Sequence, residues 1–217
     1  MILFIKCIVK KTPLYIPLRG WFQKKKIRKQ LTEWELEGKP VPPPHVFKQQ
    51  TLNHYKKLFK LKILVETGTY YGDMVESMKN HFDYIYSIEL SKKLFEKAKQ
   101  RFEGVLHIEL IYGDSGLELG KVIKKLDKPT LFWLDGHYSG GLTARGQKDT
   151  PIFEELEHIF NTPTGGHVIL IDDARCFGSE PNYPSILELS EFIKSKNSNV
   201  NILVQDDIIR VTPAKSR

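Results

Sequence analysis

The sequence predicts an α/β domain with a mostly parallel sheet, and three features indicate it. From about residue 50 onward, short apolar runs alternate with amphipathic stretches, as in chains whose parallel strands are joined by crossover helices. The apolar run Leu131–Leu134 stops abruptly at Asp135-Gly136-His137, which is typical of a strand buried on both faces. A tight turn at Asp206-Asp207 joins two final strands and predicts one antiparallel strand at or near the sheet edge. Polar residues after such strands lie at the carboxyl edge of the sheet, where open α/β folds bind ligands.

Each expected element has a local reason. Strands are expected at apolar runs that end in an acid or a glycine, and helices where apolar residues recur at helical spacing after a capping residue. Ser91 caps one helix, and Asp149-Thr150-Pro151 begins another, because proline fits the first helical position. In chain order we expect a helix at 47–60, a strand at 62–66, a helix at 72–80, a strand at 84–89, the helix after Ser91, a strand at 106–112, a helix at 115–126, the strand at 131–134, a helix at 151–161, a strand at 168–172, a helix at 184–195, and strands at 199–205 and 208–212.

The composition is that of an ordinary globular chain, but its charge is unevenly distributed. Hydrophobic residues make up 41% of the 217 residues and charged residues 27%. Residues 1–50 hold eleven of the 33 basic residues and three of the 26 acidic residues, so residues 51–217 carry 22 basic and 23 acidic side chains. The main body is therefore close to neutral, and no nucleic-acid partner is expected. The two cysteines, Cys7 and Cys176, provide no disulfide framework and suit the cytoplasm.

Residues 1–46 form a basic arm that ends in a proline-rich connector, and residues 47–217 form the main domain. Apolar residues recur at roughly helical spacing from Trp21 to Trp34, among lysines and arginines, which predicts a basic amphipathic helix. The opening apolar residues are interrupted too soon to span a bilayer, which takes about 20 apolar residues, and they do not suit a signal peptide. Two interpretations of the arm stay open. It adheres to an anionic surface, such as the inner face of the membrane, or it packs on the main domain or on a second subunit.

The first strand of the main domain runs into a glycine turn, Glu66-Thr67-Gly68-Thr69-Tyr70-Tyr71-Gly72. Glycines let the main chain turn tightly and approach a ligand, and the helix that follows offers free N–H groups. A dinucleotide-binding turn more often reads Gly-x-Gly-x-x-Gly, with no acid before it. Because an acid repels a pyrophosphate and suits a cationic or amino group, the turn argues against NAD and against a nucleotide-sugar dehydrogenase.

The second and third strands also end in acids. Glu89 follows Glu66 by 23 residues, and a carboxylate there is able to accept both hydroxyls of a ribose. Asp114, in Tyr112-Gly113-Asp114-Ser115, is able to accept the exocyclic amine of adenine. The alternative for either acid is that it caps the helix that follows.

These residues resemble the cofactor motifs of the class I S-adenosylmethionine-dependent methyltransferases, over roughly residues 60–213. The resemblance implies a Rossmann-like, doubly wound sheet of seven strands, mostly parallel with a reversed last strand. It implies that Glu89 holds the ribose and Asp114 the adenine. Tyr70 stands where a third glycine often sits, so its ring would narrow the cofactor pocket. The residues that the resemblance places at the cofactor are Glu66, Thr67, Gly68, Tyr70, Gly72, Glu89, Asp114, Ser115 and Asp135.

The fourth and fifth strands end in carboxylates that suit a hard metal ion. Asp135 follows one strand and Asp172-Asp173 the other, and three carboxylates make a ligand set that Mg²⁺ accepts. A hydroxyl bound to such a cation is acidified, and the neutral imidazole of His137 is able to take its proton. The alternative is that the acids cap loops and His137 bonds to a backbone carbonyl.

The same residues resemble the metal-dependent sugar O-methyltransferases of the macrocin and aminocoumarin antibiotic type. That resemblance implies that Asp135, Asp172 and Asp173 are metal ligands, that Asp135 and His137 are catalytic, and that His137 is the general base. Members of that group often carry an acid at the position of His137. A histidine does the same work near neutral pH.

A glycine-rich loop, Tyr138–Lys148, begins directly after His137. Its glycines suit a lid that closes over a substrate and excludes water. We expect Tyr138, Arg145, Lys148 and Arg175 to bind the substrate, the three cations by holding a phosphate or carboxylate. The alternative is that these cations are ordinary surface charges.

The sequence thus predicts a cytoplasmic S-adenosylmethionine-dependent O-methyltransferase, assisted by Mg²⁺, that methylates a hydroxyl of a carbohydrate or similar polyol. The acceptor is a small molecule or a glycan, and the arm is compatible with peripheral membrane contact or with a homo-oligomer. One alternative is a metal-independent methyltransferase that acts on another small-molecule acceptor. A second is a non-catalytic protein that keeps the cofactor pocket and whose arm binds an anionic polymer.

Overall fold

The computed structural model describes the backbone of residues 15–136, 150–180 and 182–214, and within these ranges the side chains from residue 25 onward. The chain divides into two compact units, Met1–Lys48 and Gln49–Arg217, close to the boundary expected at residues 46 and 47. The second unit contains the sheet and all the candidate site residues.

The N-terminal unit contains α2 (Tyr15–Leu36) and the first turn of α3 (His45–Leu58). Trp34 near the end of α2 is buried, its indole N–H donates to the carbonyl of Pro40 at 2.8 Å, and its ring centroid lies 4.6 Å from that of Phe47. These contacts fasten the proline-rich connector to the end of α2, and the helix expected in the arm is confirmed. Along the part of the chain that the structure describes, no helix has the length and apolar character needed to cross a membrane.

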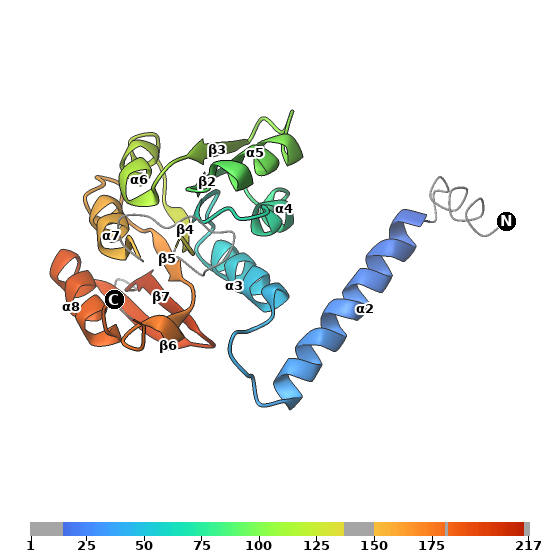
Figure 1. Cartoon of the computed structure of the whole chain (residues 1–217). Coiled ribbons are helices and arrows are strands. Elements are labelled where there is room, and N and C mark those ends of the chain that lie inside the picture. The colour runs from blue at the N-terminus through green and yellow to red at the C-terminus, as the bar shows by residue number, and fades with distance from the viewer. Residues whose placement is uncertain (1–14, 137–149, 181, 215–217) are drawn as a thin grey trace. The chain divides into compact units, whose positions relative to one another are not determined.

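The sheet has seven strands in the order β3-β2-β1-β4-β5-β7-β6 (Figure 1). Neighbouring strands from β3 to β5 are parallel, whereas β7 is antiparallel to both β5 and β6. The predicted seven-stranded, mostly parallel sheet with a reversed last strand is therefore confirmed, and the reversed strand lies one place in from the edge. The strands are β1 (Ile63–Thr67), β2 (Tyr84–Glu89), β3 (Ile108–Tyr112), β4 (Thr130–Leu134), β5 (Val168–Ile171), β6 (Val200–Gln205) and β7 (Ile208–Pro213).

Helices cover both faces of the sheet, with α4 and α5 on one side and α6, α7 and α8 on the other (Figure 1). Because side chains alternate between faces along a strand, Val65 of β1 joins the core under α6 to α8, and its neighbours Leu64 and Glu66 point to the opposite face. The helices are α4 (Asp73–Met78), α5 (Lys92–Arg101), α6 (Ser115–Ile123), α7 (Ile152–Phe160) and α8 (Ile186–Lys196), with a short 3₁₀ turn, η1 (Ala174–Cys176), after β5.

The helix starts match the sequence in type more than in detail. Ser185 forms a full capping box with Glu188 at the start of α8. Ser91 stands at the N-cap of α5 as predicted, but its side chain makes no capping hydrogen bond there. Pro151 precedes the first residue of α7 and occupies its N-cap, one position earlier than predicted.

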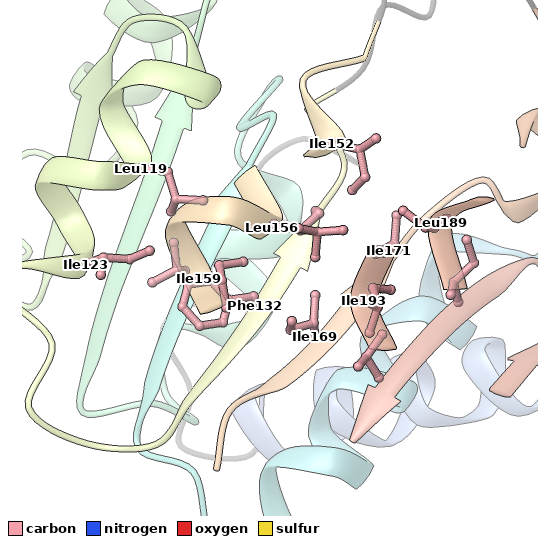
Figure 2. Packing of buried hydrophobic residues seen from close by; sticks show 14 of the residues in the cluster. Leu119, Ile123, Phe132, Ile152, Leu156, Ile159, Ile169, Ile171, Leu189 and Ile193 are labelled. Atoms are coloured by element: carbon pink, nitrogen blue, oxygen red, sulfur yellow. The ribbon is translucent and has the colours of Figure 1, made fainter. Parts of the chain in front are cut away.

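The main core lies between the sheet and helices α6 to α8. Figure 2 shows aliphatic side chains from the three helices converging on Phe132 of β4 and on Ile169 and Ile171 of β5. Full burial of one such side chain contributes roughly 1.5 to 3 kcal/mol, so this layer holds the strands in register. The labelled helical residues are Leu119, Ile123, Ile152, Leu156, Ile159, Leu189 and Ile193.

The strand order reverses between β1 and β4. From β1 the chain steps outward to β2 and β3, then returns past β1 to place β4 on its other side. The crossovers that leave β1 and β4 therefore diverge, and a crevice is expected at the carboxyl ends of these two strands. The candidate site residues follow the strands on either side of that point.

Candidate cofactor and active site

The ends of β1 and β4 meet closely at this switch point. The Asp135 N–H donates to the carbonyl of Thr67 at 3.1 Å. Gly68 has a φ of +83°, and a Cβ added to it would lie 2.4 Å from the Asp135 carbonyl oxygen. A Cβ on Gly136 would lie 3.0 Å from Thr67 Oγ1 and 3.1 Å from Ser115 Oγ. The two glycines thus allow the strand ends to touch, and four of the predicted residues, Thr67, Gly68, Ser115 and Asp135, come together at this point.

Thr67 presents a buried hydroxyl at this junction. The residue is fully buried, and its Oγ1 has no hydrogen-bond partner among the described residues. A buried hydroxyl without a partner costs roughly 1 to 3 kcal/mol, so native proteins rarely leave one unless a ligand or water completes it. The hydroxyl is therefore a point where a cofactor is able to bond.

Glu66 lies on the opposite face of β1, inside a chain of hydroxyl groups. Ser87 Oγ donates to Glu66 Oε2 at 2.5 Å, and the Ser87 and Thr69 hydroxyl oxygens are 2.6 Å apart. Burial is the largest effect on the pKa of Glu66, and together with the nearby Asp135 and Glu89 carboxylates it raises that pKa to about 8, against the lowering effect of the Ser87 hydrogen bond. At neutral pH this carboxyl group is mostly protonated, and it would favour a cationic neighbour that stabilises its ionised form.

Glu89 ties the end of β2 to the glycine turn. Its Oε2 accepts the Tyr70 N–H at 2.7 Å, and its Oε1 accepts the Ser91 N–H at 2.8 Å. Burial raises the pKa of Glu89, against these backbone hydrogen bonds that lower it. Each carboxylate oxygen has a second lone pair, so Glu89 is able to shape the turn and still accept hydroxyls from a ligand.

Tyr70 occupies a strained backbone position in the turn. Its φ is +52°, a left-handed conformation that a bulky residue rarely adopts and that persists where the surroundings impose it. Its side chain is about half exposed, and its ring packs edge-on against Tyr71 at 4.5 Å. The Tyr71 carbonyl accepts from Arg101 Nη1 at 2.6 Å, so the turn is held from both sides. A tyrosine where the motif often has glycine is thus a built feature of this turn.

Asp114 caps α6. Its Oδ1 accepts the Gly116 N–H at 2.9 Å, so the capping interpretation is confirmed for one of its two oxygens. The cap also places Ser115, which is buried, against Gly136 at the switch point. Capping and ligand binding are compatible, since a carboxylate has a second oxygen to offer.

Arg175 binds two aspartates, Asp173 in the loop after β5 and Asp207 in the turn between β6 and β7. Arg175 Nη1 donates to Asp173 Oδ1 at 2.8 Å and also to Asp207 Oδ2 in the turn between β6 and β7. The Arg175 backbone N–H donates to Asp207 Oδ1 at 2.8 Å, and the Ala174 N–H to the Asp207 carbonyl at 2.9 Å. Partial burial lowers the pKa of Arg175, but the Asp173 and Asp207 carboxylates raise it overall, so the guanidinium stays charged. The loop after β5 and the hairpin turn therefore form one linked structure.

One of the three carboxylates predicted to bind magnesium, Asp173, is engaged by a cationic side chain of the protein. Asp173 is in an ion pair with Arg175, in a left-handed backbone conformation with φ of +54°. Within residues 15–136, 150–180 and 182–214, no group of three or more His, Cys, Asp or Glu side chains is arranged to hold a metal ion. These contacts therefore do not support the magnesium prediction.

Four predicted residues, His137, Tyr138, Arg145 and Lys148, lie outside the described residues. Their roles as general base and as substrate-binding groups stay predictions. Two described histidines have structural partners, since Nε2 of His158 hydrogen-bonds with the Gly116 carbonyl and Nε2 of His107 with the Lys79 carbonyl.

The sequence did not single out Ser87, Thr69 or Asp207. Ser87 had a visible signal, because it is a hydroxyl residue inside an otherwise apolar and aromatic strand that ends in Glu89. Asp207 was recognised only as a turn residue. Its bond to Arg175 joins positions 32 residues apart, and no local pattern indicates such a pair.

No protein-family profile matches the chain, and a comparison with curated proteins found no match. Solved structures do match. An O-methyltransferase from Bacillus cereus in complex with S-adenosylhomocysteine has a TM-score of 0.57 at 14% identity, covering 87% of this chain and 90% of that one. TomG from Streptomyces achromogenes, an O-methyltransferase of tomaymycin synthesis in complex with S-adenosylmethionine, has a TM-score of 0.58 at 15% identity, covering 88% and 89%.

A third match methylates a different kind of atom. The N-methyltransferase NodS from Bradyrhizobium japonicum, in complex with S-adenosylhomocysteine, has a TM-score of 0.52 at 12% identity, covering 88% of this chain and 98% of that one. At identities this low the likeness establishes the fold. The chain has the fold of the class I S-adenosylmethionine-dependent methyltransferases.

Proposed function

We propose that the protein is an S-adenosylmethionine-dependent O-methyltransferase that acts on a hydroxyl of a carbohydrate or similar polyol. The observation that carries the proposal is Glu89. It ends β2 of a methyltransferase fold, and one of its oxygens accepts the N–H of Tyr70 in the strained turn while the other accepts the N–H of Ser91 before α5. A binding turn is thereby preorganised before any ligand arrives.

Residues around the switch point suit three polar parts of the cofactor: the ammonium group, the ribose hydroxyls and the adenine amine. The Glu66 carboxyl, with its raised pKa, suits the ammonium group. The second lone pairs of Glu89 suit the ribose hydroxyls, and Asp114 suits the adenine amine. Thr67 offers a buried hydroxyl to complete. We therefore assign these four residues, with the glycine turn, Ser115 and Asp135, to cofactor binding.

The chemistry requires alignment and one proton transfer. When bound, S-adenosylmethionine would supply a methyl group to the acceptor: the acceptor oxygen would bond in line to the methyl carbon as the carbon–sulfur bond breaks, and S-adenosylhomocysteine would leave as the thioether. The chain contributes by holding the acceptor hydroxyl and removing its proton, and we propose that His137 accepts that proton on its imidazole. Asp135 precedes it and is anchored to β1 through its own N–H, so it is suited to hold the hydroxyl at the cofactor edge. Arg145, Lys148 and Tyr138 are proposed to hold the rest of the acceptor.

Magnesium assistance and the carbohydrate acceptor rest on the sequence resemblance. The two alternative functions also stay testable, since the matched solved structures include an N-methyltransferase. Activity on hydroxylated acceptors that is lost in EDTA would favour the metal-assisted form. Activity on amines instead would favour the metal-independent alternative.

Titration calorimetry with S-adenosylhomocysteine and S-adenosylmethionine tests the cofactor assignment. We expect the wild-type chain to bind both, and Glu89→Ala to weaken binding by tenfold or more, on the order of 1.4 kcal/mol, because the turn loses its anchor and the ribose its acceptor. Glu96→Ala, at an exposed position on α5, is the matched control and should bind normally. No binding of either compound by the folded wild-type chain would contradict the proposal.

A further inference from the structure

The carboxyl edge of β5 contains a positive charge that the chain supplies itself. We propose that the Arg175 guanidinium is the resident cation of this edge and takes the place that a divalent metal would have at Asp173. The inference goes beyond the proposed methyl transfer and rests on it only for its consequence in catalysis.

The Arg175 guanidinium lies between two carboxylates. A single nitrogen, Nη1 of Arg175, donates to Asp173 from the loop after β5 and to Asp207 from the hairpin turn. Two carboxylates from separate loops thus converge on one cationic centre, which is the arrangement that a divalent ion otherwise requires. The guanidinium satisfies both with directed N–H bonds.

Arg175 is fixed in this place by backbone hydrogen bonds to Asp207. Its own N–H and that of Ala174 are bound to the same residue, Asp207, at 2.8 and 2.9 Å. The Asp207 side chain is 1% exposed, that of Asp173 is 13% exposed and that of Arg175 is 37% exposed. The two acids are therefore shielded from water, where an ion pair is held more firmly than at the surface, and removing the cation would leave a buried charge without compensation.

A divalent ion would compete with the Arg175 guanidinium for the Asp173 carboxylate. A divalent ion coordinated by Asp173 would lie next to a guanidinium that the same carboxylate already binds, and the two cations repel each other. The ion could enter only if Arg175 left, and Asp207 would then be buried as an unpaired acid. The contacts on both sides of Arg175 thus oppose a metal, whatever Asp135 and Asp172 contribute.

The consequence for catalysis is that the acceptor hydroxyl is activated by the protein's own groups. The remaining guanidinium nitrogens of Arg175 make no hydrogen bond to the described residues, and the side chain is partly exposed. Arg175 is then able to act as a positioned anchor for an anionic or oxygen-rich acceptor, which deepens the substrate role expected for it. It is a positioning residue and takes no part in the proton transfer.

Manganese binding, followed by electron paramagnetic resonance on the full-length chain, tests the inference with Mn²⁺ as the probe. We expect wild type to show no saturable Mn²⁺ binding that depends on Asp173. Arg175→Met should create such binding, tighter than wild type by roughly tenfold or more because two carboxylates become available, and adding Asp173→Asn should abolish it. Arg101→Met is the matched control, because Arg101 also binds an aspartate, Asp73, with a side chain 34% exposed, and its other acidic neighbour, Glu76, keeps its ion pair with Lys79 when Arg101 is lost.

Two results would overturn the inference: saturable Mn²⁺ binding by wild type that Asp173→Asn removes, or a folded Arg175→Met chain that gains none. If Arg175→Met does not fold, Arg175→Lys retains the charge and should still exclude Mn²⁺, and binding by this variant would equally overturn the inference. Titration of the same samples with S-adenosylhomocysteine separates the two proposals. Loss of cofactor binding in wild type contradicts the proposed function, whereas the manganese result alone decides the role of Arg175.

Discussion

Glu66 lies inside the sheet with Ser87 as a hydrogen-bond donor. Burial, with smaller contributions from the Asp135 and Glu89 carboxylates, raises the pKa of Glu66 to about 8. At the residue scale, the site therefore stores an acid that is ready to ionise when a cation arrives. Glu89 and Asp207 act on the main chain in a similar way, since the Glu89 carboxylate accepts the Tyr70 N–H and the Asp207 carboxylate accepts the Arg175 N–H.

The pH dependence of stability follows from Glu66. Its pKa of about 8 in the folded chain lies above the ordinary value of 4.5, so the folded state binds this proton more tightly than the unfolded state. Its contribution therefore falls as pH rises from about 4.5 to about 8 and is level above that range. Glu66→Gln should remove the loss, and we expect it to stabilise the chain by roughly 2 to 5 kcal/mol at pH 9 and little at pH 5.

Thermal unfolding of both chains across this pH range measures the effect, with Glu96→Gln on the surface of α5 as the control. A Glu66→Gln chain whose stability follows the wild-type pH profile would show that the carboxyl group is ionised in the fold at all these pH values. Cofactor titration of the same variant should show weaker binding, because the amide offers no charge to the ammonium group.

At the element scale, the site depends on how closely β1 and β4 approach at their carboxyl ends. Gly68 permits this approach in two ways, by adopting a φ of +83° and by having no Cβ to strike the Asp135 carbonyl. Gly104, after α5, has a φ of +77° and nothing within 4 Å of an added Cβ. The pair separates the conformational requirement from the steric one.

We expect Gly68→Ala and Gly104→Ala to destabilise the chain by different amounts. Gly104→Ala should cost about 1 to 2 kcal/mol, from the left-handed backbone alone. Gly68→Ala should cost roughly 1 to 3 kcal/mol more, because its methyl group meets backbone that cannot rotate away, and it should also weaken S-adenosylhomocysteine binding. Urea unfolding and calorimetry measure the two effects. Equal losses of stability would mean that the strand ends separate readily and that the close approach does not define the site.

At the scale of the whole molecule, the chain consists of two compact units that differ in net charge. The N-terminal unit carries the excess of positive charge, and the unit from Gln49 onward contains the sheet with its complete order of seven strands. The residues proposed to bind the cofactor all belong to the second unit, and we expect that unit to build the pocket by itself. The proposal for the arm, contact with an anionic surface, concerns partners instead.

Deleting residues 1–44, which leaves α3 whole, tests this division. We expect the shortened chain to keep its S-adenosylhomocysteine affinity and to lose salt-sensitive sedimentation with vesicles that contain an anionic lipid. A full-length chain with Lys24, Lys25, Lys26, Arg28 and Lys29 changed to Gln tests the role of charge alone, and should also fail to sediment. Unchanged sedimentation of the deletion would rule out membrane contact through the arm, and loss of cofactor binding would show that the arm supports the pocket.

The sequence by itself determined the class of fold and the edge of the sheet that carries the chemistry. Apolar runs that alternate with helical spacing are local patterns, and so are acids and glycines that follow a strand. Glu66, Gly68, Glu89 and Asp135 could be recognised for this reason, because strand direction alone places them at one edge.

Only the tertiary structure decided what these groups bind. It inserted β7 between β5 and β6, which brings Asp207 to Arg175 over 32 residues, and it set Ser87 beside Glu66 over 21 residues. It also placed Asp173, an expected metal ligand, in an ion pair with Arg175. The physical reason is that hydrogen bonds and ion pairs form between side chains that lie within about 3 Å in space, and a local sequence pattern carries no information on which distant loop closes that distance.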